Sequence, residues 1–297
     1  MSDTLASLRR KIEGAGDLES VVRSMKSLAA ASIGQYEKSV FALADYYRTV
    51  ELGLIVCLKK RVAAANEQAG RTDTAKTVSA IVFGSDQGLV GQFNDVMADF
   101  VAKTLAALPG EKKVWAVGER VHARLADAGL PPMGLFAVPT SVNAITSLVG
   151  QILVGIEAHH GPGEIGDLYL FHNGPTSGAA YEPISQHLLP LDEKWVLRLA
   201  QLPWPTRNLP GVIGCQEETL RALVREYLFV SLYKACAESL ASENASRLAA
   251  MQRAEKNIDE LVENLNQTFR RLRQTSIDEE LFDVLSGYES LSKGKTR

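Results

Sequence analysis

The chain has 297 residues, a formal net charge of -3 and 46% hydrophobic residues. This composition supports one core of ordinary size plus further structure, and the near-balanced charge excludes a polyanion such as nucleic acid as an obvious partner. No stretch reaches the roughly 18 uninterrupted apolar residues of a membrane span, and residues 1–14 look like neither a signal peptide nor an organellar transit peptide, so we expect a cytoplasmic protein.

The first segment, residues 1–65, is predicted to be a long helix that forms half of a coiled coil. No proline occurs from Leu5 to Leu54, and the apolar residues recur mostly in steps of three and four, as in a coiled-coil seam that a few glycines weaken. The seam positions are Leu5, Leu8, Ile12, Val22, Met25, Ala29, Ser32, Tyr36, Val40, Leu43, Tyr47, Val50 and Leu54.

The middle segment, residues 66–215, changes period and predicts an α/β domain. Short apolar runs at VSAIVF, KKVWAV, LFAV and DLYLFH alternate with helical patterns, which is typical of βαβ units around a parallel sheet. The stretch SGAAYEPISQHLL then predicts a turn and an antiparallel edge strand, in which Pro183 limits the pairing.

The last segment, residues 216–297, contains a second long proline-free helical pattern, so we expect the two ends of the chain to wind around each other. A helix of roughly 50 residues is about 75 Å long, whereas a domain of roughly 130 residues is under about 40 Å wide. The helices therefore either project into water or are surrounded by another protein. The second seam consists of Ala241, Ala245, Leu248, Ile258, Leu261, Leu265, Thr268 and Leu272.

The stretch FGSDQGLVGQFN raises the question of a phosphate loop, because its glycines follow an apolar run and precede a helical pattern. The glycines are Gly84, Gly88 and Gly91, and their spacing fits neither a dinucleotide fingerprint nor a P-loop, which needs a Lys and a hydroxyl residue after the last glycine. Asp86 would also repel a phosphate. We interpret the stretch as a structural strand-to-helix turn.

Other constellations also give no catalytic, cofactor or metal site. No G-x-S-x-G elbow occurs. Cys57, Cys215 and Cys236 lack partners at ligand spacing and are interpreted as buried apolar residues. The acidic run at 278–280 is interpreted as a helix start, because Ser276 followed three residues later by Glu fits a capping box.

Three long motifs resemble the γ subunit of F-type ATP synthases. FGSDQGLVGQFN is similar to that family's F-G-S-D-x-G-L-x-G-x-F-N, and ESLASENASRLAAMQRAEKN is similar to S-E-x-A-A-R-M-x-A-M-x-x-A-T-x-N. LRQTSIDEELFDVLSG resembles the family's A-R-Q-x-x-I-T-Q-E-L-x-E-I-V-x-G terminus, and the N-terminal LRRKIEGAGDLESVVRSMKSLAAAS also matches. The resemblance covers nearly the whole chain.

The resemblance implies a rotating central stalk. Its terminal helices would form an antiparallel coiled coil inside a hexamer of alternating α and β subunits. The Rossmann-like α/β domain, without a nucleotide site, would sit beside the ε subunit and on the membrane ring of c subunits. The catalytic nucleotides would belong to the surrounding subunits, so this chain would bind no nucleotide, cofactor or nucleic acid directly. It would be a peripheral protein on the cytoplasmic face of a bacterial plasma membrane.

The resemblance also assigns contacts between the rotor and the hexamer. The motif positions that carry over are Met25, Lys26, Glu243, Arg247, Arg273, Gln274 and Glu280, and the neighbouring acids Asp278 and Glu279 complete the cluster; the alternative for each is a solvated helix face. Short side chains at 24–34 and 239–251 predict smooth rod surface. A shaft turning in a bearing needs few strong contacts, since each charge-assisted hydrogen bond, on the order of 1.5–3 kcal/mol, would break at every step.

Some residues depart from the family pattern. After the alanine run the family usually has basic residues, whereas here the sequence continues ASIGQYEKS, and Asp278 and Glu279 replace the usual Thr-Gln. These departures favour a divergent branch, such as a second, ion-pumping and possibly sodium-dependent ATPase. Two other classes stay open: a coiled-coil scaffold without a surrounding hexamer, and a nucleotide-binding enzyme that uses the α/β domain.

Overall fold

The computed structural model describes residues 4–65, 77–159, 166–176, 181–191, 204–208 and 210–293, without the side chains of 59–65, 159 and 288–293. The chain divides into two compact units, residues 1–28 with 248–297 and residues 29–247. Both boundaries fall inside the long helices, whereas the sequence-based division into 1–65, 66–215 and 216–297 follows the ends of elements. We describe each unit by itself.

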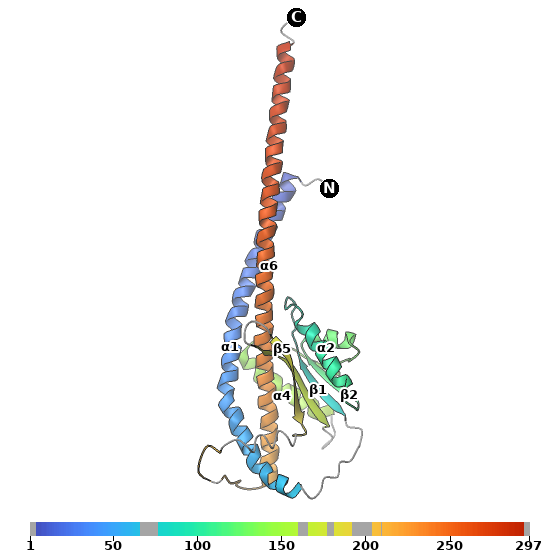
Figure 1. The fold of residues 1–297 in the computed structure, drawn as a ribbon, viewed down its shortest axis with the longest axis vertical. Helices are drawn as coiled ribbons and strands as arrows, with labels where there is room; N and C mark the ends of the chain where they lie inside the picture. Colours follow the sequence, from blue (N-terminus) through green and yellow to red (C-terminus); the bar gives the residue numbers. More distant parts are fainter. Residues whose placement is uncertain are drawn as a thin grey trace. The chain divides into compact units, whose positions relative to one another are not determined.

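The predicted fold class, an α/β domain combined with long terminal helices, is confirmed (Figure 1). The two long helices contain 61 and 78 residues. The elements are α1 (Leu5–Ala65), β1 (Val78–Phe83), α2 (Phe93–Ala106), β2 (Lys112–Val117), α3 (Glu119–Asp127), β3 (Gly134–Phe136), α4 (Val142–His159), β4 (Asp167–Pro175), β5 (Tyr181–Leu189) and α6 (Gln216–Lys293).

The sheet of the larger unit has five strands in the order β3-β2-β1-β4-β5. The first four strands are parallel, and β5 pairs antiparallel with β4 at the edge, as predicted, with Pro183 opposite Asn173. The predicted turn before β5 lies partly outside the described residues, at 177–180. The chain order reverses between β1 and β4, and the carboxyl ends of the strands at such a switch point form the crevice where doubly wound sheets bind ligands.

Side chains alternate across the sheet and form two apolar layers. On one face, Ala80 and Val82 of β1 pack with α2 and α3. On the other face, Ile81 and Phe83 pack with α4 and with the parts of α1 and α6 that belong to this unit. Because the middle strands are covered on both faces, they read as continuous apolar runs in the sequence.

The predicted seam on α1 is confirmed by burial. Leu8, Ala29, Tyr36 and Val50 are buried, and the other predicted seam positions are buried or half-buried. Ala15, which the sequence analysis omitted, is also buried and falls in the gap between Ile12 and Val22. With Ala15 and the half-buried Glu19, steps of three and four continue from Leu5 to Leu54, as coiled-coil packing requires.

The predicted seam on α6 needs one correction. Leu261 is 49% exposed, and the half-buried position is Val262. The half-buried residues Ile258, Leu265 and Leu272 keep their predicted places. From residue 258 to residue 265, steps of three then four and of four then three both satisfy the pattern, so the sequence alone did not decide between the two positions.

Two further expectations were wrong. Ser276 and the acidic residues after it lie inside α6, which continues to Lys293, so no helix begins there and no capping box forms. Cys57 and Cys236 are buried as expected, but Cys215 is exposed just before α6.

Candidate functional site

The glycine-containing turn after β1 is a closed hydrogen-bonded loop. The Ser85 backbone N–H donates to Asn94 Oδ1 at 3.0 Å, and Asn94 Nδ2 donates to Ser85 Oγ at 2.8 Å. A Cβ atom at Gly84 would lie 2.3 Å from Val121 Cβ on α3, so this position needs glycine. Gly91 has a φ of 59°, a conformation that favours glycine, although Leu89 in the same turn has a φ of 62°. Gly88 has space for a side chain. The turn therefore packs helices against the sheet.

Asp86 organises the neighbouring loops. Its Oδ1 accepts a hydrogen bond from the backbone N–H of Glu119, the first residue of α3, at 2.9 Å. Its Oδ2 accepts one from the backbone N–H of Val138 at 2.8 Å. A carboxylate at a helix N-terminus takes the place that an anion would occupy. Both carboxylate oxygens are thus engaged within the protein.

The switch-point crevice is in contact with α6. Ser246 Oγ donates to the carbonyl of Val90, in the turn after β1, at 2.6 Å. On β4, His172 Nε2 lies 2.8 Å from Glu238 Oε2 of α6. Next to it, Asn173 Nδ2 donates to the carbonyl of Phe93 at the start of α2. Helix α6 therefore contacts the turn after β1 and strand β4, which border the switch point.

Glu243 and Arg247 lie inside the larger unit. Arg247 Nη2 donates to Glu243 Oε1 at 2.6 Å, and only 7% of the Glu243 side chain and 12% of the Arg247 side chain are exposed. Burial raises the pKa of the Glu243 carboxyl, an effect that Arg247 opposes and Asp86 reinforces. Their contact with another subunit stays a prediction, and this pairing leaves little of either side chain available for one. Residues 239, 242 and 246 are buried too, so this part of the predicted smooth stretch is not rod surface.

In the smaller unit, Lys26 pairs within the chain and Met25 is half-buried. Lys26 Nζ lies 2.5 Å from Glu255 Oε2, which joins α1 to α6, and Arg23 approaches the same carboxylate at 3.8 Å. The hydrogen bond from Lys26 holds the pKa of the Glu255 carboxyl below its ordinary value.

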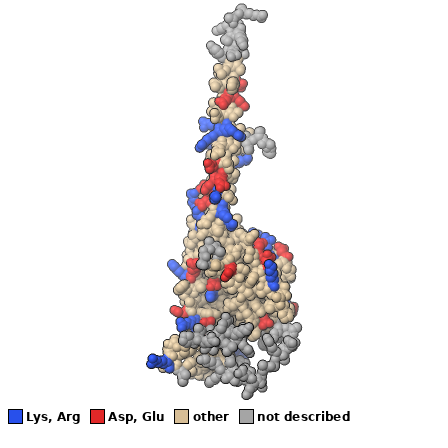
Figure 2. Space-filling model, in the orientation of Figure 1, with Lys and Arg blue, Asp and Glu red and all other residues tan. Residues whose placement is uncertain are grey.

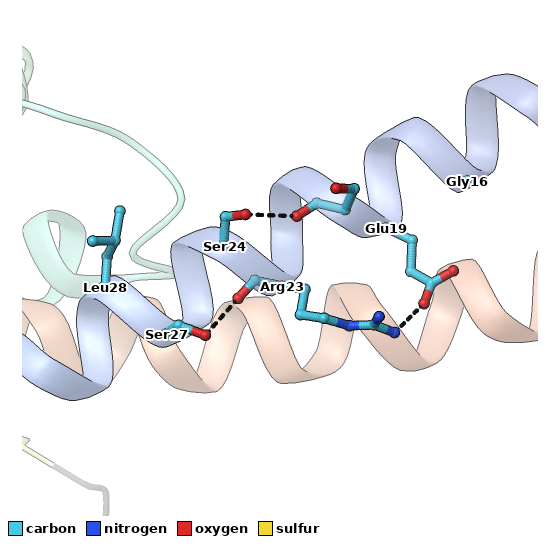
Figure 3. Close-up of a pocket in the computed structure, with 7 residues that line it drawn as sticks. Gly16, Glu19, Arg23, Ser24, Ser27 and Leu28 are labelled. Carbon is cyan, nitrogen blue, oxygen red and sulfur yellow. Dashed lines mark hydrogen bonds and ion pairs between the residues drawn. The ribbon is translucent and has the colours of Figure 1, made fainter.

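A shallow groove runs along α1 beside this pair (Figure 3). Two of its hydroxyl groups bond to their own helix: Ser24 Oγ donates to the carbonyl of Ser20, and Ser27 Oγ to the carbonyl of Arg23, each at 3.0 Å. Such bonds leave fewer polar groups for strong intermolecular contacts. The lining residues are Gly16, Glu19, Ser20, Arg23, Ser24, Ser27 and Leu28.

The distal part of α6 is exposed along its length in the smaller unit. Figure 2 shows Lys and Arg gathered in blocks that alternate with blocks of Asp and Glu. A basic block at 270–273 precedes the acidic block at 278–283, and Gln274 lies between them. All the predicted contact residues of this region, Arg273, Gln274, Asp278, Glu279 and Glu280, are exposed.

The sequence analysis missed an apolar surface in the same region. Within and beside the acidic block at 278–283, large apolar side chains are at least half exposed; they are Ile277, Leu281, Phe282, Val284 and Leu285. Large exposed apolar patches on soluble proteins are commonly interaction sites. The spacing of these residues in the sequence resembles that of a buried seam. A search for apolar periodicity therefore does not distinguish this exposed surface from a buried one.

Two absences apply to the part of the chain that the structure describes. No group of three His, Cys, Asp or Glu side chains there is arranged to hold a metal ion. No helix among these residues combines the length and the apolar character needed to cross a bilayer.

Comparison with known proteins identifies the family. The model of the ATP synthase family matches residues 4–291. The γ chain of ATP synthase from Syntrophus aciditrophicus is 25% identical over 300 residues, which cover 98% of this chain and 99% of that one. The chain belongs to the ATP synthase γ-chain family. As a γ chain, it is a non-catalytic subunit of that complex.

Other γ-chain relatives and solved stalks agree with this assignment. The γ chain of Syntrophobacter fumaroxidans is also 25% identical, over 98% of this chain and 99% of its own length. A chain from the Euglena gracilis mitochondrial ATP synthase, in an assembly of OSCP, F1 and c-ring, has a TM-score of 0.65 at 15% identity and covers 99% of this chain and 96% of that chain. A chain of the Tetrahymena thermophila central stalk and c-ring has a TM-score of 0.56 at 20% identity, over 79% and 99% of the two chains. These similarities show the shared fold.

Several residues that carry the hydrogen bonds of the turn after β1 and of its neighbours β4 and α6 were not singled out from the sequence. Asn94, His172 and Ser246 were missed, although Asn94 ends the quoted glycine motif and so carried a signal. His172 and Ser246 contact residues 66 and 156 positions away, which no local pattern reports.

Proposed function

We propose that this γ chain is the turning shaft of an F-type ATPase. It couples ion flow through a membrane ring of c subunits to ATP synthesis or hydrolysis at an α3β3 hexamer, and it contacts a small ε subunit beside its α/β domain. The family match across residues 4–291 carries this proposal. The chain itself performs no chemistry in this role.

The exposed end of α6 supports a surrounding partner. Its apolar side chains, among them Phe282 at 68% and Val284 at 70% exposure, would remain in water unless another protein covered them. On α1 a second set of exposed apolar residues, Leu18, Val21 and Leu28, lies near Met25. We propose that hexamer loops contact both surfaces, and that the α1 groove, in which the hydroxyls of Ser24 and Ser27 are bonded internally, lets those loops pass.

In this proposal, the exposed acidic residues near the end of α6 bind basic groups of the hexamer only at particular angles of rotation. Asp278, Glu279 and Glu280 are exposed, and none of them takes part in an ion pair with another described residue. A basic group of the hexamer at about 4 Å would interact by on the order of 4 kcal/mol at an effective dielectric near 20, before desolvation. Arg273 and Gln274, one to two turns earlier, face the same partner in this proposal.

The location and the ion follow from the complex. We propose that the chain is peripheral, on the cytoplasmic face of a bacterial plasma membrane, held there by the ring. The transported ion, H⁺ or Na⁺, is chosen by the ring. The departures at Asp278 and Glu279 favour a divergent, ion-pumping branch. The two ions are distinguished by measuring ion pumping in membrane vesicles, first with a proton uncoupler and then with a sodium ionophore, because each reagent dissipates the gradient of only one ion.

Co-purification tests the shaft proposal. The chain is expressed with an affinity tag, and membranes are prepared from those cells. At low ionic strength these membranes should release the chain together with α and β subunits, in a ratio of three α to three β to one tagged chain. A scaffold without a surrounding hexamer would instead be recovered alone. Calorimetric titration of the isolated chain with ATP and NAD addresses the enzyme alternative, and a stoichiometric site of micromolar affinity would contradict the shaft proposal.

A further inference from the structure

We propose that the α/β domain turns α6 through a two-point polar joint, an inference that rests on the proposed shaft function. One point is the pair of Glu238 on α6 and His172 on β4, and the other is the pair of Ser246 on α6 and the Val90 carbonyl in the turn after β1. We call these four residues the joint. All of them belong to the larger unit.

The two points hold α6 at different heights and on different sides. Glu238 and Ser246 are eight residues apart, which in an α-helix corresponds to about 12 Å along the axis and about 80° around it. A single contact would leave the helix free to pivot about that contact. Two contacts separated in both directions resist sliding along the axis and rolling about it.

Polar contacts suit this task because they are directional. Apolar burial is non-directional and depends on the area removed from water, whereas a hydrogen bond prefers an angle above about 150° and weakens steeply below about 120°. Roll of α6 about its own axis is the motion that torque on a shaft produces. Both contacts are protected from competition by water, since His172 is 3% and Ser246 is 7% exposed.

The same helix supplies matched controls. Ser239 and Ser242 are buried like Ser246, but their hydroxyls have no hydrogen-bond partner among the described residues. His187 likewise matches His172: its Nε2 lies 3.3 Å from Asp167 Oδ1, but both residues belong to the sheet and neither contacts α6 through this pair. Changes at Ser242 and His187 therefore remove similar groups without touching the joint.

The joint is tested first in the full chain. Spin labels on cysteines introduced at the exposed residues Lys103 on α2 and Arg225 on α6, in a chain that carries Cys215→Ser, report the distance between the two elements. Loss of one net hydrogen bond changes a two-state population about fivefold. In Ser246→Ala, the fraction of molecules whose label-to-label distance departs from the main wild-type distance should rise about fivefold. Ser246→Ala combined with His172→Phe should raise this fraction further. Glu238 keeps a partner in the double variant, because Lys234 lies 3.8 Å away.

The control variant Ser242→Ala with His187→Phe should leave the distance distribution as in the wild type. If His172→Phe does not fold, Ser246→Ala compared with Ser242→Ala carries the test alone. An unchanged distribution in Ser246→Ala would overturn the joint.

The second measurement uses the assembled enzyme in vesicles. With the joint weakened, ATP hydrolysis and subunit composition should stay as in the wild type, while the number of ions pumped per ATP falls under a high opposing gradient. The control variant should pump normally. Normal pumping by a variant whose distance distribution has broadened would overturn the inference, because torque would then bypass the joint. Absence of the wild-type chain from the complex would instead overturn the shaft proposal itself.

Discussion

The ammonium of Lys26 lies 2.5 Å from the carboxylate of Glu255, and this ion pair joins α1 to α6 in the smaller unit. Sequence motifs had assigned Lys26 to contacts with another subunit. Because Lys26 is already paired, a contact with the hexamer would have to share or break this bond. The positive charge of Lys26 is therefore largely offset by Glu255 on this part of the shaft surface.

The Lys26 pair should make stability fall in acid. The hydrogen bond from Lys26 lowers the pKa of Glu255, so its contribution is present above the unfolded pKa of about 4.5 and is lost as pH falls through the lower folded pKa. Glu255→Gln should lower the thermal midpoint at pH 7, and the difference from the wild type should shrink as pH falls below about 4.5 through the lower folded pKa. Glu260→Gln, which alters the exposed pair with Lys256 at 3.9 Å, is the control. Equal effects of the two changes would show that the Lys26 pair contributes nothing specific.

Glu243 should give the opposite pH dependence. Burial raises its pKa, so the folded chain retains a proton that the unfolded chain releases, and stability decreases as pH rises from about 4.5 through the raised folded pKa. Glu243→Gln removes this titration. The thermal midpoint of Glu243→Gln minus that of the wild type should therefore become more positive between pH 4.5 and pH 8. A difference that is constant, or that moves the other way, would contradict the account of this site.

The corrected seam can be tested with adjacent residues. Val262→Asp places a charge at a half-buried position between the helices and should destabilise the chain by about 1–3 kcal/mol. Leu261→Asp changes a residue that is 49% exposed and should cost within about 0.5 kcal/mol. Denaturant unfolding of both variants measures the two values. A larger loss of stability in Leu261→Asp than in Val262→Asp would contradict the corrected seam and support the register in which Leu261 faces it.

These outcomes show what the sequence could and could not specify. The runs VSAIVF and KKVWAV matched β1 and β2 at both ends, because a strand buried on both faces has a distinct apolar composition. Leu261 was misplaced because a seam read in steps of three and four has two solutions there. Ser276 was misread as a cap because the capping pattern also occurs inside helices.

The buried contacts of α6 were beyond any local pattern. Glu243 looks like a surface residue in a helical sequence, and its burial depends on α6 meeting the sheet and the turn around residue 86. Likewise, the glycine turn was correctly interpreted as structural from the missing Lys, but the role of Asp86 as an acceptor for two loop amides depends on residues 33 and 52 positions away.

The acidic block of α6 should affect coupling more than assembly. Asp278→Thr with Glu279→Gln restores the residues that the γ family usually has and removes two exposed charges. The ratio of ions pumped to ATP hydrolysed should shift in the same vesicles while subunit stoichiometry stays fixed. Glu263→Gln, an exposed acid elsewhere on α6, is the control. An unchanged ratio at both low and high salt would mean that the block is only a solvated helix face.

Rotation of the assembled enzyme tests the central claim most directly. The hexamer is fixed to a surface, and a bead is attached to the α/β domain through a cysteine introduced at the exposed Lys103, in a chain that carries Cys215→Ser. If the chain is the shaft, added ATP should drive sustained rotation of the bead in one direction, and rotation should stop when ATP is removed. Hydrolysis of ATP by a hexamer that contains the chain, with a bead that shows only random angular motion, would contradict the account.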